Sequence, residues 1–577
     1  MKFFRKFWIA AALTAILLTG VLSAQKTSAP AHTAAAKSAD HPKLVVILVV
    51  DQMRADYVDH FRNQWTGGLA RLVREGAWYR LAAYPYMTTV TCAGHATIST
   101  GAFPATHGMI ANSWYERDEP GGGRNVTCTQ DSSVKNIGYN GDTTGADSPA
   151  RLRVATFSDA LRAQAGGGTR VVAFSLKARA AETLAGHRAD AVAWHDDQTG
   201  VWATSSYYGT STFVADYTRA HPVSADYGKT WNMSLPASAY LYDDPTDGQH
   251  TRPGWTMGFP HPLRGLETST GADHAFYVQW EESPFSDEYM EKMAVAAVDS
   301  FKLGQGNSTD FLAISFSALD HVGHDMGPHS HELQDVLVRL DRDVDDLLKH
   351  LDATVGRGNY VVAFSSDHGV APIPEQSQRD GLGGGRVSAV SIRRHVNELA
   401  GKSIGEAAAI AAMNDGDIVF TAKAEEKFRA QPQALEAIVK EIESTPGVLR
   451  VFYPDQLDPM PQTPDPILRA ASLSYVAGRS GDLVIALKPY YIFAETGTAS
   501  APAGGTSHGT ANSYDQRVPL IFYGYGIRGG IYLDQASPAD IAPTFAYLCN
   551  ITLARVDGHV LTSSIAPQSP ATPPHSH

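Results

Sequence analysis

The sequence of 577 residues contains only three cysteines, Cys92, Cys128 and Cys549. Three cysteines are too few for a fold held together by disulfides, and an odd number allows one bridge at most. Their positions do not indicate which two would pair. The fold must therefore depend on a hydrophobic core, and hydrophobic residues, at 43% of the chain, are sufficient for a large one.

Positive charge is also scarce. Lys and Arg number 47 against 60 Asp and Glu, which gives a formal net charge of -13. Surfaces that bind nucleic acids are basic, so this balance argues against a nucleic-acid-binding protein. A ligand that carries phosphate would have to meet a few locally placed cations instead.

Long apolar runs are absent after the first two dozen residues. There, Lys2, Arg5 and Lys6 precede an apolar run over 7–22 that ends at Ser23 and Ala24. This pattern predicts a signal peptide over 1–24 and export to the periplasm or the cell exterior. The alternative is a membrane anchor, but the run falls short of the roughly 20 residues that a spanning helix needs. We expect a disordered leader over 25–42 and a monomeric mature chain without a membrane anchor.

The remaining sequence alternates apolar segments with amphipathic ones. Strands are expected at 44–50, 171–174, 311–316, 360–364, 483–487 and 519–523, and apolar residues from Leu333 to Leu351 predict one long helix. Such alternation is typical of an α/β fold with a mainly parallel sheet sandwiched by helices.

Two stretches interrupt the alternation, at about 200–300 and about 390–475. We interpret both as cap subdomains inserted into one domain that spans 43–563. The Pro, Ser, Thr and His content of 564–577 predicts a disordered tail.

Acidic residues and histidines follow three of the predicted strands and recur once near the C-terminus. They are Asp51, Asp320, His324, Asp367, His368 and His508. The carboxyl ends of parallel strands converge on one crevice, where ligands bind in open α/β sheets. Three carboxylates and three imidazoles suit zinc or a similar transition metal, and they can hold two ions. Each residue alone could be a helix cap or a satisfied polar group, and we assign His321 and His331 to that class.

A threonine in this region is a candidate nucleophile. In the segment Thr-Thr-Val-Thr-Cys-Ala-Gly-His, the chain turns into a helix close to Thr91, where backbone N–H groups and the helix dipole would favour an alkoxide and a phosphoryl group. Metal coordination can activate such a hydroxyl. Thr88 and Thr89 are alternatives that spacing alone does not exclude.

Cations that could bind phosphate follow the strand at 171–174. Lys177 and Arg179 would point to one face if the chain there is extended, and could then bind one anion. Asn112 is a weaker candidate for the same role, since Asn is common in turns.

Taken in order, these motifs resemble the alkaline phosphatase superfamily in its type I phosphodiesterase and nucleotide pyrophosphatase branch. The resemblance covers about 44–560 and is greatest to bacterial phosphate-irrepressible alkaline phosphatases of the PafA kind. It implies one zinc ion on Asp51, Asp367 and His368, a second on Asp320, His324 and His508, and Thr91, four residues before His95, as nucleophile and additional metal ligand.

The resemblance also bears on the substrate. Lys177 and Arg179 look like the pair of the monoesterase type, whereas Asn112 matches an Asn that phosphodiesterase relatives share. The Cys92-Ala93 pair departs from relatives, which often carry other residues, commonly including Pro, at these positions. We therefore predict an exported zinc phosphatase that hydrolyses small phosphate monoesters through a phosphothreonine. A phosphodiesterase or nucleotide pyrophosphatase, and a secreted metal-binding module without catalysis, are the alternatives.

Overall fold

A computed structural model describes residues 41–119, 122–165, 167–414, 416–494 and 504–567. All of them belong to one unit of the chain. The predicted signal peptide, nearly all of the predicted leader and most of the predicted tail lie outside the described residues. Within the described ranges, no helix has the length and apolar character that crossing a membrane requires.

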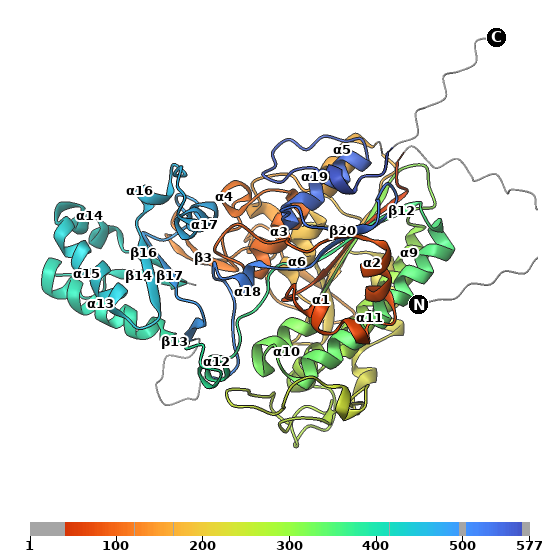
Figure 1. Ribbon diagram of the computed structural model, residues 1–577, viewed down its shortest axis with the longest axis horizontal. Helices are drawn as coiled ribbons and strands as arrows, with labels where there is room; N and C mark the ends of the chain where they lie inside the picture. Colours follow the sequence, from red (N-terminus) through yellow and green to blue (C-terminus); the bar gives the residue numbers. More distant parts are fainter. Residues whose placement is uncertain (1–40, 120–121, 166, 415, 495–503, 568–577) are drawn as a thin grey trace, which may run out of the picture. The chain divides into compact units, whose positions relative to one another are not determined.

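The main element is a ten-stranded sheet with a parallel centre (Figure 1). Its strands, in spatial order, are β20 (Gly530–Tyr532), β2 (Ala77–Tyr79), β19 (Leu520–Gly524), β12 (Tyr360–Ser365), β1 (Leu44–Val50), β11 (Asp310–Phe316), β6 (Val171–Ser175), β7 (Ala191–Asp196), β8 (Val201–Ser205) and β5 (Asn136–Tyr139). The five strands from β12 to β7 are mutually parallel. Four of the six predicted strands therefore lie in this parallel centre.

Strand β1 shows why the sheet is covered on both faces. Every residue of β1 is buried, and alternate side chains enter two different cores. Leu44, Val46 and Leu48 belong to the first core, whereas Val45 and Ile47 belong to the second. A continuous apolar run is the pattern expected of a strand between two helical layers.

Helices complete both cores. The first includes residues of α2 (Gly68–Glu75), α9 (Pro284–Phe301), α10 (Ala318–Met326) and α11 (His331–Leu351). The second includes residues of α3 (Thr91–Thr100), α5 (Phe157–Gln164), α6 (Ala178–Ala185) and α19 (Ile541–Leu548). The predicted α/β sandwich is confirmed, as is the long helix, which is α11.

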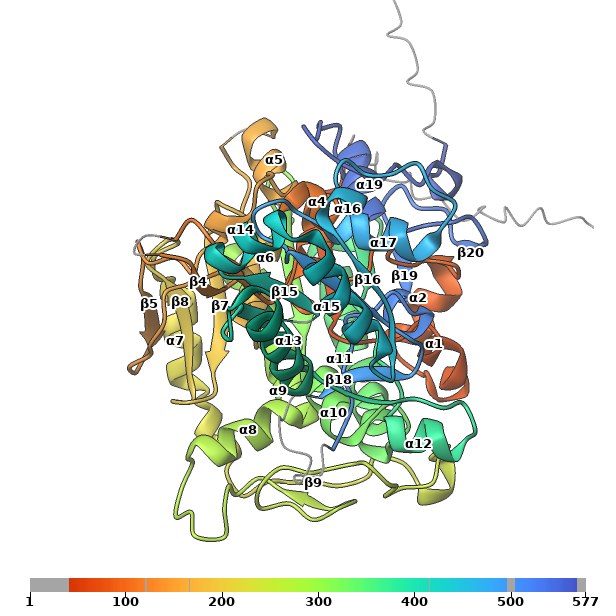
Figure 2. The same ribbon diagram turned by 90° about the vertical axis from the view of Figure 1, so that its left-hand side faces the viewer.

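A second, smaller sheet forms a core of its own. It has the order β14 (Ile410–Asn414), β15 (Asp417–Phe420), β17 (Leu483–Leu487) and β16 (Val448–Phe452), and its pairs are antiparallel. Figure 2 shows α13 (Ala389–Ile404), α14 (Ala422–Ala430) and α15 (Pro432–Ser444) in front of its strands, with which they share a hydrophobic cluster. Two short strands flank this part of the chain. β13 (Gly385–Ser388) directly precedes α13, β18 (Tyr491–Ala494) follows β17, and the two pair in parallel.

The structure corrects three interpretations that were based on the sequence. The strand at 483–487 exists as β17 but belongs to the second sheet, and the strand at 519–523 pairs antiparallel to β12 as β19. Helix α9, the last part of the predicted insertion at about 200–300, packs in the first core and so belongs to the covering layer of the large sheet. Apolar periodicity reveals that an element is buried, but it does not reveal in which sheet or core.

Candidate active site

The register of the central strands brings the predicted site residues together. Strand β1 pairs with β11 on one side and β12 on the other, so that Val50 lies opposite Phe316 and Val49 opposite Ser365. The chain segments that follow these three strands carry Asp51, Asp320 and Asp367. All three carboxylates are buried, with exposed fractions of 4% or less.

Two groups of residues at this edge can hold metal ions. In the first, Asp320, His324 and His508 offer ligand atoms that all lie within 4.8 Å of one another. Asp320 and His324 lie four residues apart in α10, so they share one helix face, and His324 Nε2 is 3.2 Å from Asp320 Oδ1. This is the trio that the sequence resemblance assigns to one ion.

The second group consists of Asp51, Asp320 and His368. His368 Nε2 lies 3.4 Å from Asp51 Oδ1 and 3.3 Å from Asp367 Oδ2, so Asp367 adjoins the group as well. Asp320 is common to both groups, which the resemblance did not imply. The rings of His368 and His508 stack at 3.6 Å, so the two groups are neighbours.

The histidines are oriented by the backbone. Nδ1 of His324 donates to Thr506 O at 2.9 Å, Nδ1 of His368 to Gly369 O at 2.9 Å, and Nδ1 of His508 to Thr89 O at 2.8 Å. Because a carbonyl oxygen can only accept, each Nδ1 carries a hydrogen, and in the neutral ring each Nε2 then presents a lone pair. A fixed tautomer of this kind is typical of metal-binding histidines.

Polar atoms without partners support a cation at this position. Among the described residues, no hydrogen bond reaches the buried atoms Asp51 Oδ1, Asp367 Oδ2 and His368 Nε2. His95 Nδ1 lies 3.1 Å from Asp367 Oδ2, but it donates to the Thr91 carbonyl oxygen at 2.8 Å. Burying unpaired acceptors is costly, and a divalent cation would compensate all three.

The charges of the site shift its pKa values in opposite directions. Burial raises the pKa of Asp51 well above its ordinary value, and the charges of Asp320 and Asp367 raise it further. Burial would also raise the pKa of Asp320, but Lys177 and His324 outweigh this effect and hold it well below its ordinary value. Burial would lower the pKa of His324, but the Asp320 carboxylate raises it to about 9. The site thus concentrates negative charge that only nearby cations offset.

Thr91 was expected near a helix N-terminus; it is the first residue of α3 and is 1% exposed. A glycine is required one turn later, because a Cβ on Gly94 would lie 2.2 Å from the Asp367 carbonyl oxygen. The start of α3 therefore packs directly against the segment that carries Asp367 and His368. The His95 ring fixes this turn through Thr91 O and through Ser315 Oγ, which lies 2.7 Å from Nε2.

Asn112 lies beside the start of the same helix. Its Oδ1 accepts a hydrogen bond from Cys92 N at 2.9 Å, which leaves the amide nitrogen as the group that can donate to a ligand. Cys92 forms a disulfide with Cys128, and Cys549 is a buried free cysteine.

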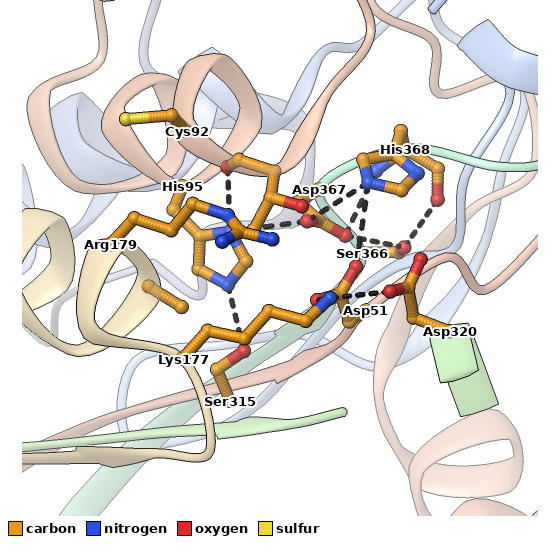
Figure 3. A network of polar contacts seen from close by, with 12 residues as sticks. Asp51, Cys92, His95, Lys177, Arg179, Ser315, Asp320, Ser366, Asp367 and His368 are labelled. Carbon is orange, nitrogen blue, oxygen red and sulfur yellow. Dashed lines mark hydrogen bonds and ion pairs between the residues drawn. The ribbon is translucent and has the colours of Figure 1, made fainter. Parts of the chain in front are cut away.

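The extended conformation considered for Lys177 and Arg179 is found at Lys177 but not at Arg179, which is helical. β6 ends at Ser175, Lys177 is the N-cap residue of α6, and Arg179 lies in its first turn. The sequence that follows Lys177 is rich in Ala, a strong helix former, which favours a helix from Ala178 onward. Both side chains nevertheless extend toward the centre of the site in Figure 3.

The two cations differ in their contacts. Lys177 Nζ donates to Asp51 Oδ2 at 2.6 Å and also to Asp320, which are predicted ligands of different ions. Arg179 Nε is buried and has no hydrogen-bond partner among the described residues. Arg179 therefore retains an unused donor at Nε.

Sequence reasoning missed two residues that hold the site together. Gln52 donates through Nε2 to Asp320 Oδ1 at 2.7 Å and through its backbone N–H to Asp367 Oδ1 at 3.1 Å, with a left-handed φ of 70°. His95 was noted only as part of a motif, although it orients Thr91. The adjacency of Gln52 to Asp51 was visible in the sequence, but its contacts with Asp320 and Asp367 depend on segments hundreds of residues away.

A cavity of about 340 Å³ adjoins the first metal-binding group. His508 and Ser113 line it together with apolar residues from the second sheet and its neighbours, among them Met413, Ile485 and Phe493. This space could receive the organic part of a small ligand.

Comparison with known proteins identifies the family. Residues 45–511 match the family described as type I phosphodiesterase / nucleotide pyrophosphatase. The chain belongs to this family. The prediction of a hydrolase from this branch of the alkaline phosphatase superfamily is therefore confirmed.

Curated relatives in the family cover nearly the whole chain. The chain is 32% identical to the alkaline phosphatase PhoV of Synechococcus elongatus, over 93% of this chain and 95% of PhoV. It is also 32% identical to the alkaline phosphatase PafA of Elizabethkingia meningoseptica, over 95% of this chain and 96% of PafA.

Solved structures agree. The crystal structure of wild-type PafA has a TM-score of 0.83 at 31% identity and covers 91% of this chain and 99% of PafA. Murine ectonucleotide pyrophosphatase/phosphodiesterase 5, at 14% identity and a TM-score of 0.50, shares the fold.

Proposed function

We propose that this protein is an exported, zinc-dependent alkaline phosphatase that hydrolyses phosphate monoesters with Thr91 as its nucleophile. The observation that carries the proposal is the placement of Thr91. It begins α3, and α3 packs through Gly94 onto the segment that carries Asp367 and His368. A hydroxyl at a helix N-terminus beside a pair of metal-binding groups is suited to phosphoryl transfer.

The reaction would proceed in two displacements. Thr91 Oγ1 loses its proton to solvent and attacks phosphorus, the bond from phosphorus to the ester oxygen breaks, and that oxygen takes up a proton from solvent and leaves as the alcohol. Water then attacks the phosphothreonine, which releases inorganic phosphate and restores the Thr91 hydroxyl. Zinc ions held by Asp51, Asp367 and His368 and by Asp320, His324 and His508 would act as Lewis acids toward the attacking and leaving oxygens.

Three side chains would stabilise the other phosphoryl oxygens. Arg179 has an unused buried donor, Asn112 presents its amide nitrogen, and Lys177 places an ammonium between Asp51 and Asp320. Charge-assisted hydrogen bonds of this kind stabilise the charge that develops during transfer. A monoester carries one more negative charge than a diester, so two cations favour the monoester.

The relatives support this assignment. PhoV and PafA are both named alkaline phosphatases. One solved PafA variant carries substitutions at a threonine, an asparagine, a lysine and an arginine, the same four residue types proposed here. The family description favours a second candidate function, the hydrolysis of phosphodiesters or nucleotide pyrophosphates at the same site.

Export rests on two observations. The first 24 residues have the pattern of a signal peptide. The Cys92–Cys128 disulfide is of a kind that persists in oxidising compartments such as the periplasm.

The deciding experiment compares kcat/KM of the purified mature protein on an aryl phosphate monoester and on the matching diester, with metal removed and zinc restored. We expect zinc-dependent activity and preference for the monoester. Preference for the diester would overturn the role given to Lys177 and Arg179 and support the second candidate.

A paired substitution tests the nucleophile. Thr91→Ala should lower kcat by roughly 10⁴-fold or more, because removing a nucleophile removes the covalent route. Thr212 provides a matched control, since it is the first residue of α7 (Thr212–Ala220) but is exposed. Thr212→Ala should retain activity, and a phosphorylated peptide that contains Thr91 should be trapped from the unsubstituted protein and from Thr212→Ala but not from Thr91→Ala. Full activity of Thr91→Ala would refute the proposal.

A further inference from the structure

The Cys92–Cys128 disulfide lies at the nucleophile rather than at a remote surface. Cys92 directly follows Thr91 in α3, and both cysteines are fully buried. Cys128 directly follows β4 (Arg124–Thr127), which pairs with β3 (Ser113–Glu116) in a short hairpin. The bridge therefore joins the first turn of α3 to the open end of this hairpin.

Asn112 lies between the two bridged residues. It directly precedes β3, its side-chain Oδ1 accepts from Cys92 N at 2.9 Å, and its backbone oxygen accepts from Cys128 N at 3.0 Å. The disulfide and these two hydrogen bonds close a ring. Within this ring, neither the backbone nor the amide of Asn112 can move relative to Cys92 without breaking a bond.

The hairpin has other anchors that do not involve sulfur. The Arg479 guanidinium lies 4.9 Å from the centre of the Trp114 ring, and Arg479 donates to Gly108 O at 2.6 Å. Trp114, Val126 and both cysteines also belong to one apolar cluster. Loss of the bridge should therefore leave the hairpin folded, while the distance between Asn112 and Thr91 is no longer fixed by a covalent link.

We propose that the Cys92–Cys128 disulfide has a positioning role: it fixes the position of the Asn112 amide relative to Thr91 for phosphoryl transfer. The inference rests on the proposed function, in which Asn112 donates to a phosphoryl oxygen and Thr91 attacks phosphorus. A positioning role predicts that the bridge acts through Asn112. A role in stability alone predicts that it does not.

A double-mutant cycle separates these two roles. The four proteins are the unsubstituted enzyme, Asn112→Ala, Cys92→Ala/Cys128→Ala, and the triple variant, all loaded with zinc and assayed on an aryl phosphate monoester well below their melting temperatures. We expect the double cysteine variant to lose about 10- to 100-fold in kcat/KM, mostly in kcat, the scale of a small misplacement of a catalytic group. Removing the bridge from Asn112→Ala should then cost less than about 2-fold, because coupled residues are not additive.

Additive losses would overturn the inference and leave the disulfide a purely structural role. Unchanged activity of Asn112→Ala would instead refute the role of Asn112 in the proposed function, so the two failures are distinguishable. Cys549→Ala is the matched control, because Cys549 is buried but unpaired and lies in the core that contains α19. It should retain activity.

A second measurement covers the case in which the cysteine variants fail to fold. The unsubstituted protein is produced under reducing conditions, its free thiols are counted by alkylation and mass spectrometry, and the disulfide is then formed with oxidised glutathione. We expect kcat to rise on oxidation by the factor that the variants lose, at unchanged zinc content. Equal kcat before and after oxidation would overturn the inference.

Discussion

The two sheets of this protein have the same construction, but the acidic residues beside their strands differ in their hydrogen bonds. In both, buried apolar strands are covered by helices. Asp482 stands next to β17 in the second sheet, where Oδ1 accepts from Arg117 Nη2 and Oδ2 accepts from Phe420 N, each at 2.7 Å. Asp51 stands next to β1 in the large sheet, where Oδ1 is buried and has no hydrogen-bond partner in the described part of the chain.

This difference separates an acid whose two oxygens are both hydrogen-bonded from one with a buried oxygen that a cation could bind. A buried carboxylate without a partner costs free energy, whereas one that accepts two hydrogen bonds helps to hold a loop. The same contrast holds for Asp367, whose Oδ2 faces His368 Nε2 at 3.3 Å. Acids at the ends of strands therefore differ in their hydrogen bonds, and the sequence alone does not reveal this difference.

The largest effect is expected when one acid of each kind, Asp367 and Asp482, is replaced by asparagine. Asp367→Asn should lower kcat/KM by more than about 10²-fold and lower the zinc content, since loss of a ligand should exceed the 10- to 100-fold effect of outer partners. Asp482→Asn should leave zinc content unchanged and cost mainly stability. Metal analysis and steady-state kinetics of both variants test this expectation, which fails if Asp367→Asn retains two zinc ions per chain.

A smaller effect is expected at Gln52, which contacts a carboxylate of each predicted metal site. Gln52→Gly retains the left-handed backbone, which glycine adopts without strain, and removes only the amide that orients Asp320. Zinc affinity, measured by competition with a chelator, should fall by about 10- to 100-fold. Gln378→Ala, at an exposed glutamine, is the control. Unchanged affinity in Gln52→Gly would show that Asp320 is oriented without it.

The smallest expected effect concerns stability rather than the site. Asp287 accepts from the backbone N–H groups of Ser317 and Ala318 at the start of α10, and burial raises its pKa to about 7. A raised folded-state pKa adds stability below the unfolded value near 4, and this contribution is lost as the pH rises through 7.

Asp287→Asn keeps an acceptor for both N–H groups but cannot ionise. Its free energy of unfolding relative to the unsubstituted protein should therefore improve by about 2 to 3 kcal/mol between pH 5 and pH 8. Asp346→Asn, at an exposed aspartate of α11, should show no such trend. Denaturant titrations at the two pH values provide the measurement, and parallel curves for both variants would contradict the raised pKa.

Sequence patterns predicted much of the fold for a simple physical reason. Strands buried on both faces need continuous apolar runs, so β1, β6, β11 and β12 were recognisable locally. The assignment of 483–487 to the large sheet was wrong because a buried strand has the same sequence pattern in either sheet. Lys177 and Arg179 were named correctly as cations near the site, but their conformation depended on where β6 ends.

The sequence by itself determined which residues could carry the chemistry: the acids and histidines at strand ends, Thr91 before a helix, and a basic pair. Those choices are local, because they depend on residue type and on the nearest strand or helix. Only the tertiary structure decided that Asp320 belongs to both metal-binding groups, that Gln52 spans them, and that Cys92 pairs with Cys128 around Asn112. These relations join segments distant in the chain, and their distances are set by how β1, β11, β12 and α3 pack together.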